Sequence, residues 1–395
     1  MLNRSRFEQA LLQKSDQFLS YDALLQQRQE EDAQRWRRVV AMPVSEVLAR
    51  LSVETAPGAV PFGGDEHSSW CVEFSHRFAH HEEARTWAYR VLEGQGVLAV
   101  DGSQLMPDKE FSLPVAAVQA GWFWNPHVQG QAFVKDLWMD ILGPEDLKAS
   151  GSGGRLFHEQ FISLQRFCLE VEKIKYFIKS PGRLSPSVSS IGLALFDGSM
   201  LVSFAEVLMD LYRDAYVKAA RSLLLCSQDK RVPLFGYVDT SLARDLCRMC
   251  GVLLDEPETA SSIVDADLVA PFLPNWGDRT IAFRCRRPGI LKHYRDTGGG
   301  LGFAYLRASS KTSPVRVEFP WWMVEVGVLE RAFDVLRAEL IVGNGYPYAL
   351  ETADQLAWFS PLDRRTFQRW IGAFLAHQSV KIERSNKLNS KARRR

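Results

Sequence analysis

Apolar and polar positions follow two different periods along the chain, and each period is typical of one kind of element. Residues 3–53 place apolar side chains at helical spacing among Gln, Glu and Arg, which predicts helix. Val97–Leu105 and Leu193–Leu201 are instead short apolar runs that lead into Asp-Gly-Ser, and they predict buried strands. Strand-like and helical stretches then alternate, and residues 279–320 read as a meander. This alternation predicts an α/β fold with a mixed sheet.

The remaining periodic segments complete the predicted fold. The further strands are expected at residues 111–124 and 233–238, and the further helices at residues 157–179, 204–228, 325–342 and 347–358, with two more that begin at Ser241 and Pro361. The chain shows no internal repeat with a period of about 20–50 residues, so the sequence does not predict a solenoid or a propeller.

Breaks in the pattern suggest how the domains are organised. Residues 54–67 are rich in Pro and Gly and are predicted to be a linker. We therefore expect a helical N-terminal extension at 1–53, a main domain at 68–378 and a basic tail at 381–395. The tail carries seven Lys or Arg against one Glu, whereas the whole chain has a net charge of +1. Its lack of apolar residues predicts disorder, and it serves either as a solubilising segment or as an arm that binds phosphates.

Composition limits the class of protein. The chain is 46% hydrophobic and 24% charged, which is ordinary for a globular protein. No apolar run reaches the roughly 18 residues that a membrane span requires, so we expect no membrane segment. The first residues show no export signal, so we expect a cytoplasmic protein whose six cysteines are reduced thiols.

Asp101 and Asp197 are the strongest candidates for chemistry, because each follows an apolar strand-like run. A buried carboxylate is unfavourable unless it is paired, hydrogen-bonded or bound to a cation. A single Asp-Gly-Ser is more often a turn, but two copies suggest neighbouring strands with their carboxylates side by side. Adjacent carboxylates repel each other, so the pair indicates a shared proton or a divalent ion. Oxygen ligands favour Mg²⁺ or Mn²⁺.

The helix predicted before the second Asp-Gly-Ser offers a third carboxylate. Glu170 shares a helical face with apolar Phe167, Ile174 and Phe177, whereas Glu172 lies on a more polar face. The inward-facing group is therefore expected to be Glu170, and the alternative is an exposed salt bridge.

Two other pairs of residues are weaker candidates. Cys247 and Cys250 form a single CxxC, which supplies only two of the four ligands of a zinc site, so buried structural thiols are expected. Arg307 and Lys311 flank a turn from which they could reach a phosphate backbone, and a solvated turn is an equal alternative.

Several motifs together resemble the NurA nucleases, which process DNA ends with the HerA translocase. They are the two Asp-Gly-Ser strands, "FGYVDTS" at Phe235–Ser241, "FAYLRAS" and "VRVEFPWW" within Phe303–Trp322, and "GYPYALETADQLA" at Gly345–Ala357. They occur in the family's order over roughly residues 95–360. Each motif is weak alone, but the ordered set is fairly specific.

The resemblance implies an RNase H-like mixed-sheet core flanked by helices, and Mn²⁺-dependent exonuclease and endonuclease activity on single-stranded DNA. It also implies a homodimer docked on a HerA-type ATPase hexamer. The carried-over site consists of Asp101, Glu170, Asp197 and Tyr346, which would act with one or two Mn²⁺ or Mg²⁺ ions. Asp354 stands where the family has a His eight residues after the Tyr, so its role as the fourth metal ligand is a hypothesis.

The sequence therefore favours a metal-dependent DNA nuclease that acts in DNA repair or defence. The main alternative keeps the fold without the chemistry, as a catalytically inactive dimeric cap or adaptor that threads DNA into a motor. A binding protein with unrelated Asp-Gly-Ser turns is a third possibility.

Overall fold

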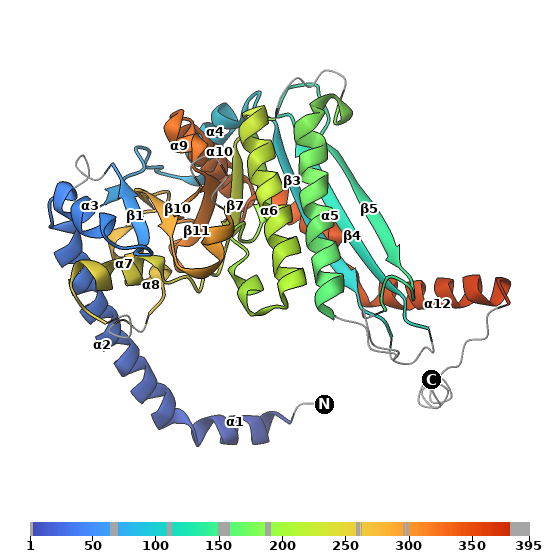
Figure 1. The fold of residues 1–395 in the computed structure, drawn as a ribbon, viewed down its shortest axis with the longest axis horizontal. Coiled ribbons are helices and arrows are strands. Elements are labelled where there is room, and N and C mark those ends of the chain that lie inside the picture. The colour runs from blue at the N-terminus through green and yellow to red at the C-terminus, as the bar shows by residue number, and fades with distance from the viewer. Residues whose placement is uncertain are drawn as a thin grey trace. The chain divides into compact units, whose positions relative to one another are not determined.

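The computed structural model describes residues 3–63, 70–108, 113–148, 159–185, 191–257, 261, 263–294, 297 and 300–379. The predicted basic tail at 381–395 lies outside them. The described strands form an 11-stranded mixed sheet flanked by helices (Figure 1). The chain divides into two compact units: Met1–Arg77, Val238–Leu291 and Leu301–Val317 form the first, and Phe78–Tyr237, Lys292–Gly300 and Glu318–Arg395 form the second.

The second unit holds the strands that carry the Asp-Gly-Ser motifs. Five strands lie in the order β7 (Leu234–Val238), β6 (Leu193–Asp197), β3 (Val97–Leu105), β4 (Ala116–Asn125) and β5 (Val134–Leu142). β6 is parallel to both β3 and β7, whereas β3–β4 and β4–β5 are antiparallel pairs. The prediction of a mixed sheet is therefore confirmed.

Helices cover the strands of the second unit. α5 (Glu159–Lys179) and α6 (Asp210–Lys230) pack side by side, and α5 also contacts β3 and β4 (Figure 1). α11 (Tyr348–Ala357) packs on the same two strands. α10 (Leu329–Val342) contacts α4 (His81–Leu92), and α12 (Pro361–His377) follows α11 in the chain.

The first unit contains the N-terminal helices and the meander. Its helices are α1 (Arg4–Leu12), α2 (Ser15–Val40), α3 (Val44–Ser52), α7 (Asp245–Leu253) and α8 (Asp265–Val269). Its strands are β1 (Gly58–Phe62), β2 (Cys71–Val72), β8 (Arg279–Thr280), β9 (Ala282–Arg286) and β10 (Leu301–Leu306). β11 (Val315–Pro320) begins in this unit and ends in the second.

Two details differ from the sequence prediction. The prediction of a linker at 54–67 is wrong for residues 58–62, which form strand β1. β1 pairs antiparallel with β9, with Gly58 opposite Arg286 and Phe62 opposite Ala282. Gly58 starts that strand with φ +92°, and a Cβ there would lie 2.3 Å from the Asp245 carbonyl oxygen. A glycine is therefore required at this position by the close backbone contact as well as by the positive φ.

Strand β5 had not been predicted, since most of its apolar side chains are exposed and follow no clear alternation. Among the described helices, none is long and apolar enough to cross a membrane.

Candidate active site

Strands β3 and β6 bring the two Asp-Gly-Ser motifs together. Their parallel register pairs Val100 with Phe196, so the next residue on each strand is Asp101 or Asp197. β6 ends at Asp197, whereas β3 continues to Leu105 beside β4. Both carboxylates are half-buried, and the charge of Asp197 raises the pKa of Asp101. The structure therefore places the two carboxylates as neighbours at the end of a buried strand pair.

Glu170 reaches the same point from α5. Its side chain is 2% exposed, and its carboxylate lies against Gly102, where a Cβ would come within 2.3 Å of Glu170 Oε1. The glycine of the first motif is therefore needed because it leaves room for this carboxylate. Glu170 also forms an ion pair with Arg166, one helical turn earlier, and Arg166 Nη1 donates to the Gly102 carbonyl oxygen at 3.3 Å.

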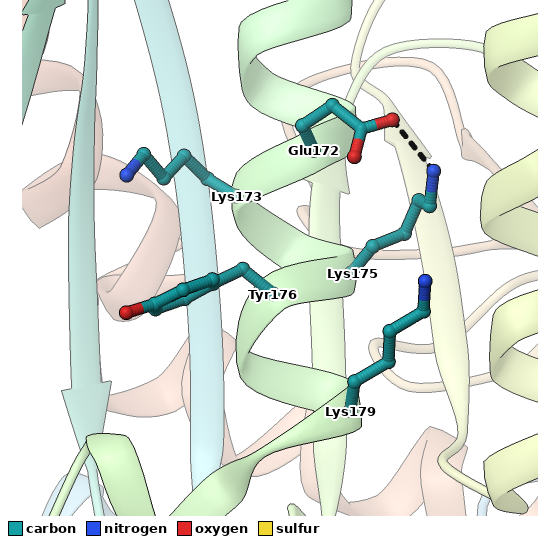
Figure 2. A pocket seen from close by; sticks show the side chains of 5 residues that line it. All are labelled: Glu172, Lys173, Lys175, Tyr176 and Lys179. Atoms are coloured by element: carbon teal, nitrogen blue, oxygen red, sulfur yellow. Dashed lines mark hydrogen bonds and ion pairs between the residues drawn. The ribbon is translucent and has the colours of Figure 1, made fainter.

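Glu172 lies on the outer side of the same helix. It is exposed, and its Oε1 pairs with Lys175 Nζ at 2.6 Å. Figure 2 shows this pair beside Lys179, with Lys173 and Tyr176 on the other side of α5. Together these five side chains line an open cavity of about 280 Å³. Helical spacing therefore separates the two glutamates as the hydrophobic pattern had suggested, with Glu170 inward and Glu172 in solvent.

Tyr346 and Asp354 approach the cluster from α11 and the loop before it. The Tyr346 hydroxyl donates to Asp197 Oδ2 at 3.1 Å. Asp354 is exposed but lies close enough to Asp101 to raise its pKa through its charge and a hydrogen bond. This approach depends on Gly121, which pairs with Asp101 in the sheet, because a Cβ there would lie 2.6 Å from the Ala353 carbonyl oxygen.

Polar contacts fix α11 on the strands. The Ala357 carbonyl oxygen, at the end of the helix, accepts from the Ser103 hydroxyl and from Gln119 Nε2, the latter at 2.5 Å. Ser103 belongs to the first Asp-Gly-Ser motif. At the other end, the Ala349 backbone N–H donates to buried Glu339 Oε2 at 2.8 Å. Both ends of the helix that carries Asp354 are therefore held by hydrogen bonds.

A buried carboxylate holds the second motif. Glu318 Oε2 accepts from the Ser199 hydroxyl at 3.0 Å, from the Met200 N–H at 2.8 Å and from the Leu201 N–H at 3.3 Å. Glu318 is the glutamate of the "VRVEFP" motif and is 1% exposed. The Ser of each motif therefore makes a structural hydrogen bond: Ser103 donates to the end of α11, and Ser199 donates to Glu318.

Burial and mutual repulsion keep the acidic cluster partly protonated near neutral pH. Burial, then the charge of Asp197, raises the pKa of Asp101 to about 7, against a backbone hydrogen bond from Gly102. Burial also raises the pKa of Glu170 to about 8, although Arg166 opposes the shift. Burial and the charge of Asp197 raise the pKa of the Tyr346 hydroxyl, so it remains a hydrogen-bond donor. A cation that displaces these protons would be favoured.

The donor set suits a hard divalent ion. In the described part of the chain, no three Asp, Glu, His or Cys side chains are already arranged to hold a metal ion. The cluster nevertheless supplies only oxygen donors, and its carboxylates repel each other. These are the properties expected of a site for Mn²⁺ or Mg²⁺. The chemistry of these donors therefore fits such an ion.

The weaker candidates lie in the first unit, whereas the acidic cluster belongs to the second. The Arg307 guanidinium donates to the backbone carbonyls of Leu273, Ala270 and Thr312, which is a structural role. Lys311 lines an open cavity of about 330 Å³ that also includes Arg307. Cys247 and Cys250 lie in α7 and are buried thiols, as expected.

Arg166 is the functional candidate that sequence reasoning missed. It lies four residues before Glu170 and so shares its helical face, a spacing that could have identified it. Gln119, Glu318 and Glu339 also make hydrogen bonds that support the site. The sequence carries no comparable local signal for them, because the helical or strand pattern around each does not reveal its partner.

Comparisons with known proteins place this geometry in a family. A family model described as a NurA domain matches residues 95–359. The NurA nuclease from Sulfolobus solfataricus has a similar structure, with a TM-score of 0.55 and 14% identity over 96% of this chain and 99% of that chain. No curated protein sequence matches the chain.

Two further solved structures are more distant. A NurA structure with manganese has a TM-score of 0.41 and 12% identity, over 71% of this chain and 89% of that chain. The catalytic domain of human Endonuclease V has a TM-score of 0.37 and 14% identity, over 72% and 88%. The expected mixed sheet flanked by helices is confirmed, and the NurA nuclease from Sulfolobus solfataricus has a similar fold. Since the family model covers most of the chain, including both Asp-Gly-Ser strands and α11, this protein belongs to the NurA family.

Proposed function

We propose that this chain is a metal-dependent deoxyribonuclease that hydrolyses phosphodiester bonds in DNA. The observation that carries the proposal is the convergence of Asp101, Asp197 and Glu170 within a NurA-family fold. Besides burial, the charge of Asp197 raises the pKa of Asp101, and the charges of both aspartates raise the pKa of Glu170. Structural proteins have little use for three carboxylates that repel one another at the end of a buried strand pair. Their mutual repulsion is what a divalent cation would relieve.

The proposed ligands are Asp101, Glu170, Asp197 and Asp354, which would hold one or two Mn²⁺ or Mg²⁺ ions. Such ions, when bound, lower the pKa of an attacking water and stabilise charge on the leaving oxygen. The chain's own residues then set the geometry. Glu318 fixes the backbone after Asp197, and Gly102 lets Glu170 approach the strand.

Tyr346 has a positioning role in this proposal. Its hydroxyl donates to Asp197 Oδ2, and its raised pKa keeps the proton on the oxygen through the physiological range. It therefore cannot act as a general base, but it restricts the orientation of the Asp197 carboxylate. The phenol has a single proton, so it would have to release Asp197 before it could donate to a phosphate oxygen of DNA, whereas its oxygen can still accept from a water molecule while the contact is kept.

The finer features of the proposal follow the family resemblance. We propose Mn²⁺ as the preferred ion and single-stranded DNA as the substrate, cut in the cytoplasm by exonuclease and endonuclease action during DNA-end resection. These features rest on family membership and on the oxygen-only donor set, which Mn²⁺ accepts as readily as Mg²⁺.

A direct assay tests the nuclease proposal. The full chain should release nucleotides from a labelled single-stranded oligodeoxynucleotide with Mn²⁺ and not with EDTA. Glu170→Gln should lower the rate at least about 10³-fold, because it removes a ligand of the reacting centre. Glu172→Gln is the matched control on the same helix and should cut at the wild-type rate, since Glu172 lies in solvent.

The opposite results would favour a different function. If the wild-type chain binds DNA but releases no nucleotide with any divalent ion, the protein is an inactive cap or adaptor of the same fold. Asp354 in the place of the family's His is the feature that keeps this alternative open. If both glutamine variants retain activity, catalysis does not use Glu170.

We also propose a homodimer that docks on a HerA-type ATPase hexamer. Support comes from apolar side chains left exposed on edge strand β5 and on α12, with Trp138 at 54%, Trp370 at 67% and Phe374 at 60% exposure. Exposed edges and aromatic patches of this kind usually meet a partner. Light scattering on a sizing column should give twice 44.7 kDa, and a larger species when the ATPase is added. A stable monomer at micromolar concentration would contradict the dimer.

A further inference from the structure

Arg166 places a positive charge inside the acidic cluster. Its guanidinium pairs with Glu170 and donates to the Gly102 carbonyl oxygen at 3.3 Å. The Arg166 side chain is 32% exposed, whereas the Glu170 side chain is 2% exposed. The arginine thus connects a buried carboxylate to the solvent side of the cluster, from which a DNA strand would approach.

This ion pair differs from an ordinary helix-stabilising pair. The cation precedes the anion by four residues, which is the less favourable order along a helix. Glu170 is also buried, and removing such a pair from water usually offsets its attraction. Stability alone therefore gives little reason for a cation at this position.

Arginine is well suited to a second partner at this place. Its guanidinium has five N–H donors in a planar fork that matches a phosphate, and only part of that fork contacts Glu170 and Gly102. If Glu170 ligates a divalent ion, its charge is shared with that ion, and the like charges of ion and guanidinium repel each other. Arg166 would then be free to contact an anion at the exposed side.

We propose that Arg166 is a substrate-binding residue, which neutralises Glu170 while no metal ion is bound and contacts a backbone phosphate of DNA when Glu170 serves as a metal ligand. This inference rests on the proposed nuclease function. It makes Arg166 a competitor of the metal ion and a partner of the DNA. Removal of the arginine should therefore raise the affinity for Mn²⁺ and lower the affinity for DNA.

Two binding measurements test the proposal on the full chain. In calorimetric titrations with MnCl₂ alone, Arg166→Gln should bind Mn²⁺ about tenfold more tightly than wild type, because a competing cation is gone. In fluorescence anisotropy with labelled oligothymidylate and Ca²⁺ as a non-cleaving ion, the same variant should bind DNA about tenfold more weakly. Arg166→Lys keeps the charge but not the fork, so its Mn²⁺ affinity should stay near wild type while its DNA affinity falls.

Lys175→Gln is the matched control. Lys175 also pairs with a glutamate of α5, but that pair lies on the outer side of the helix (Figure 2). The Lys175→Gln variant should bind both Mn²⁺ and DNA with the affinity of wild type. Equal losses in Lys175→Gln and Arg166→Gln would mean that general charge, rather than this site, attracts DNA, and would overturn the proposal.

Other outcomes separate the possible failures. Weaker Mn²⁺ binding by Arg166→Gln would overturn the proposal, because it would make Arg166 a positioning residue for Glu170. Unchanged DNA binding by the two Arg166 variants would overturn it as well, and Arg166→Lys alone decides this point if Arg166→Gln does not fold. If wild type binds no Mn²⁺, the proposed nuclease function fails and this inference fails with it.

Discussion

Asp101→Asn should be inactive yet more stable than wild type above pH 7. In the unfolded chain Asp101 ionises near its ordinary pKa of 3.8, whereas burial and Asp197 raise its folded pKa to about 7. Between these values the folded state binds more protons than the unfolded state, so stability falls as pH rises. Above the folded pKa the full penalty is present. Asn cannot ionise, and the variant escapes this penalty.

The expected gain is about 2 kcal/mol in unfolding free energy at pH 8, because neighbouring carboxylates share the repulsion. Thermal unfolding without metal, followed from pH 4 to pH 8, measures it: the two proteins should nearly coincide at pH 4 and separate as pH rises. Asp140→Asn replaces an exposed Asp of β5 and serves as the control. An Asp101→Asn protein no more stable than wild type at pH 8 would contradict the arrangement, since the two carboxylates would not be repelling each other.

Asp354 variants should show whether this carboxylate replaces the family's His as a ligand. Asp354→Ala should lower nuclease activity about 10–100-fold at limiting Mn²⁺, and excess Mn²⁺ should partly restore it, because a missing ligand weakens binding without removing the reaction path. Asp354→His should retain measurable activity, since imidazole also binds Mn²⁺. Asp354→Asn should fall between the two, with one neutral oxygen ligand.

The competing explanation is that Asp354 only pairs with a cation on the following helix, such as Arg364 or Arg365. Asp354→Ala would then lose about 1 kcal/mol or less of stability and cut DNA like wild type at every Mn²⁺ concentration. The proposed ligand role is supported by the charge and the hydrogen bond through which Asp354 acts on Asp101. Measuring rates over a Mn²⁺ series, with Arg365→Gln as the control, distinguishes the two explanations.

The sequence predicted those parts of the site that have a local cause. Asp101 and Asp197 end apolar runs, so strand periodicity was sufficient to select them. The inward position of Glu170 could be predicted because it lies on the apolar face of a single helix. Tyr346 contacts Asp197 across 149 residues, and no local pattern encodes such a contact. It was identified only through the resemblance to a family.

The fold shows the same division. Helices with an apolar face were predicted close to their bounds, α5 to within two residues and α6 to within six, because periodicity reflects burial on one side. β5 was missed because edge strands need not alternate when both faces remain open. β1 was taken for a linker, since the same Pro and Gly that break helices also occur in edge strands.

The position of α11 in the chain has a consequence for biosynthesis. Asp101 is made early, but Asp354 and the Ala357 carbonyl that Ser103 holds come more than 250 residues later. Domains fold as their residues leave the ribosome, and so the acidic cluster is complete only near the end of translation. A chain that terminates before residue 346 would carry three of the carboxylates without the helix that closes the cluster. If the proposed nuclease activity needs the whole cluster, truncated products would cut little of the cell's DNA.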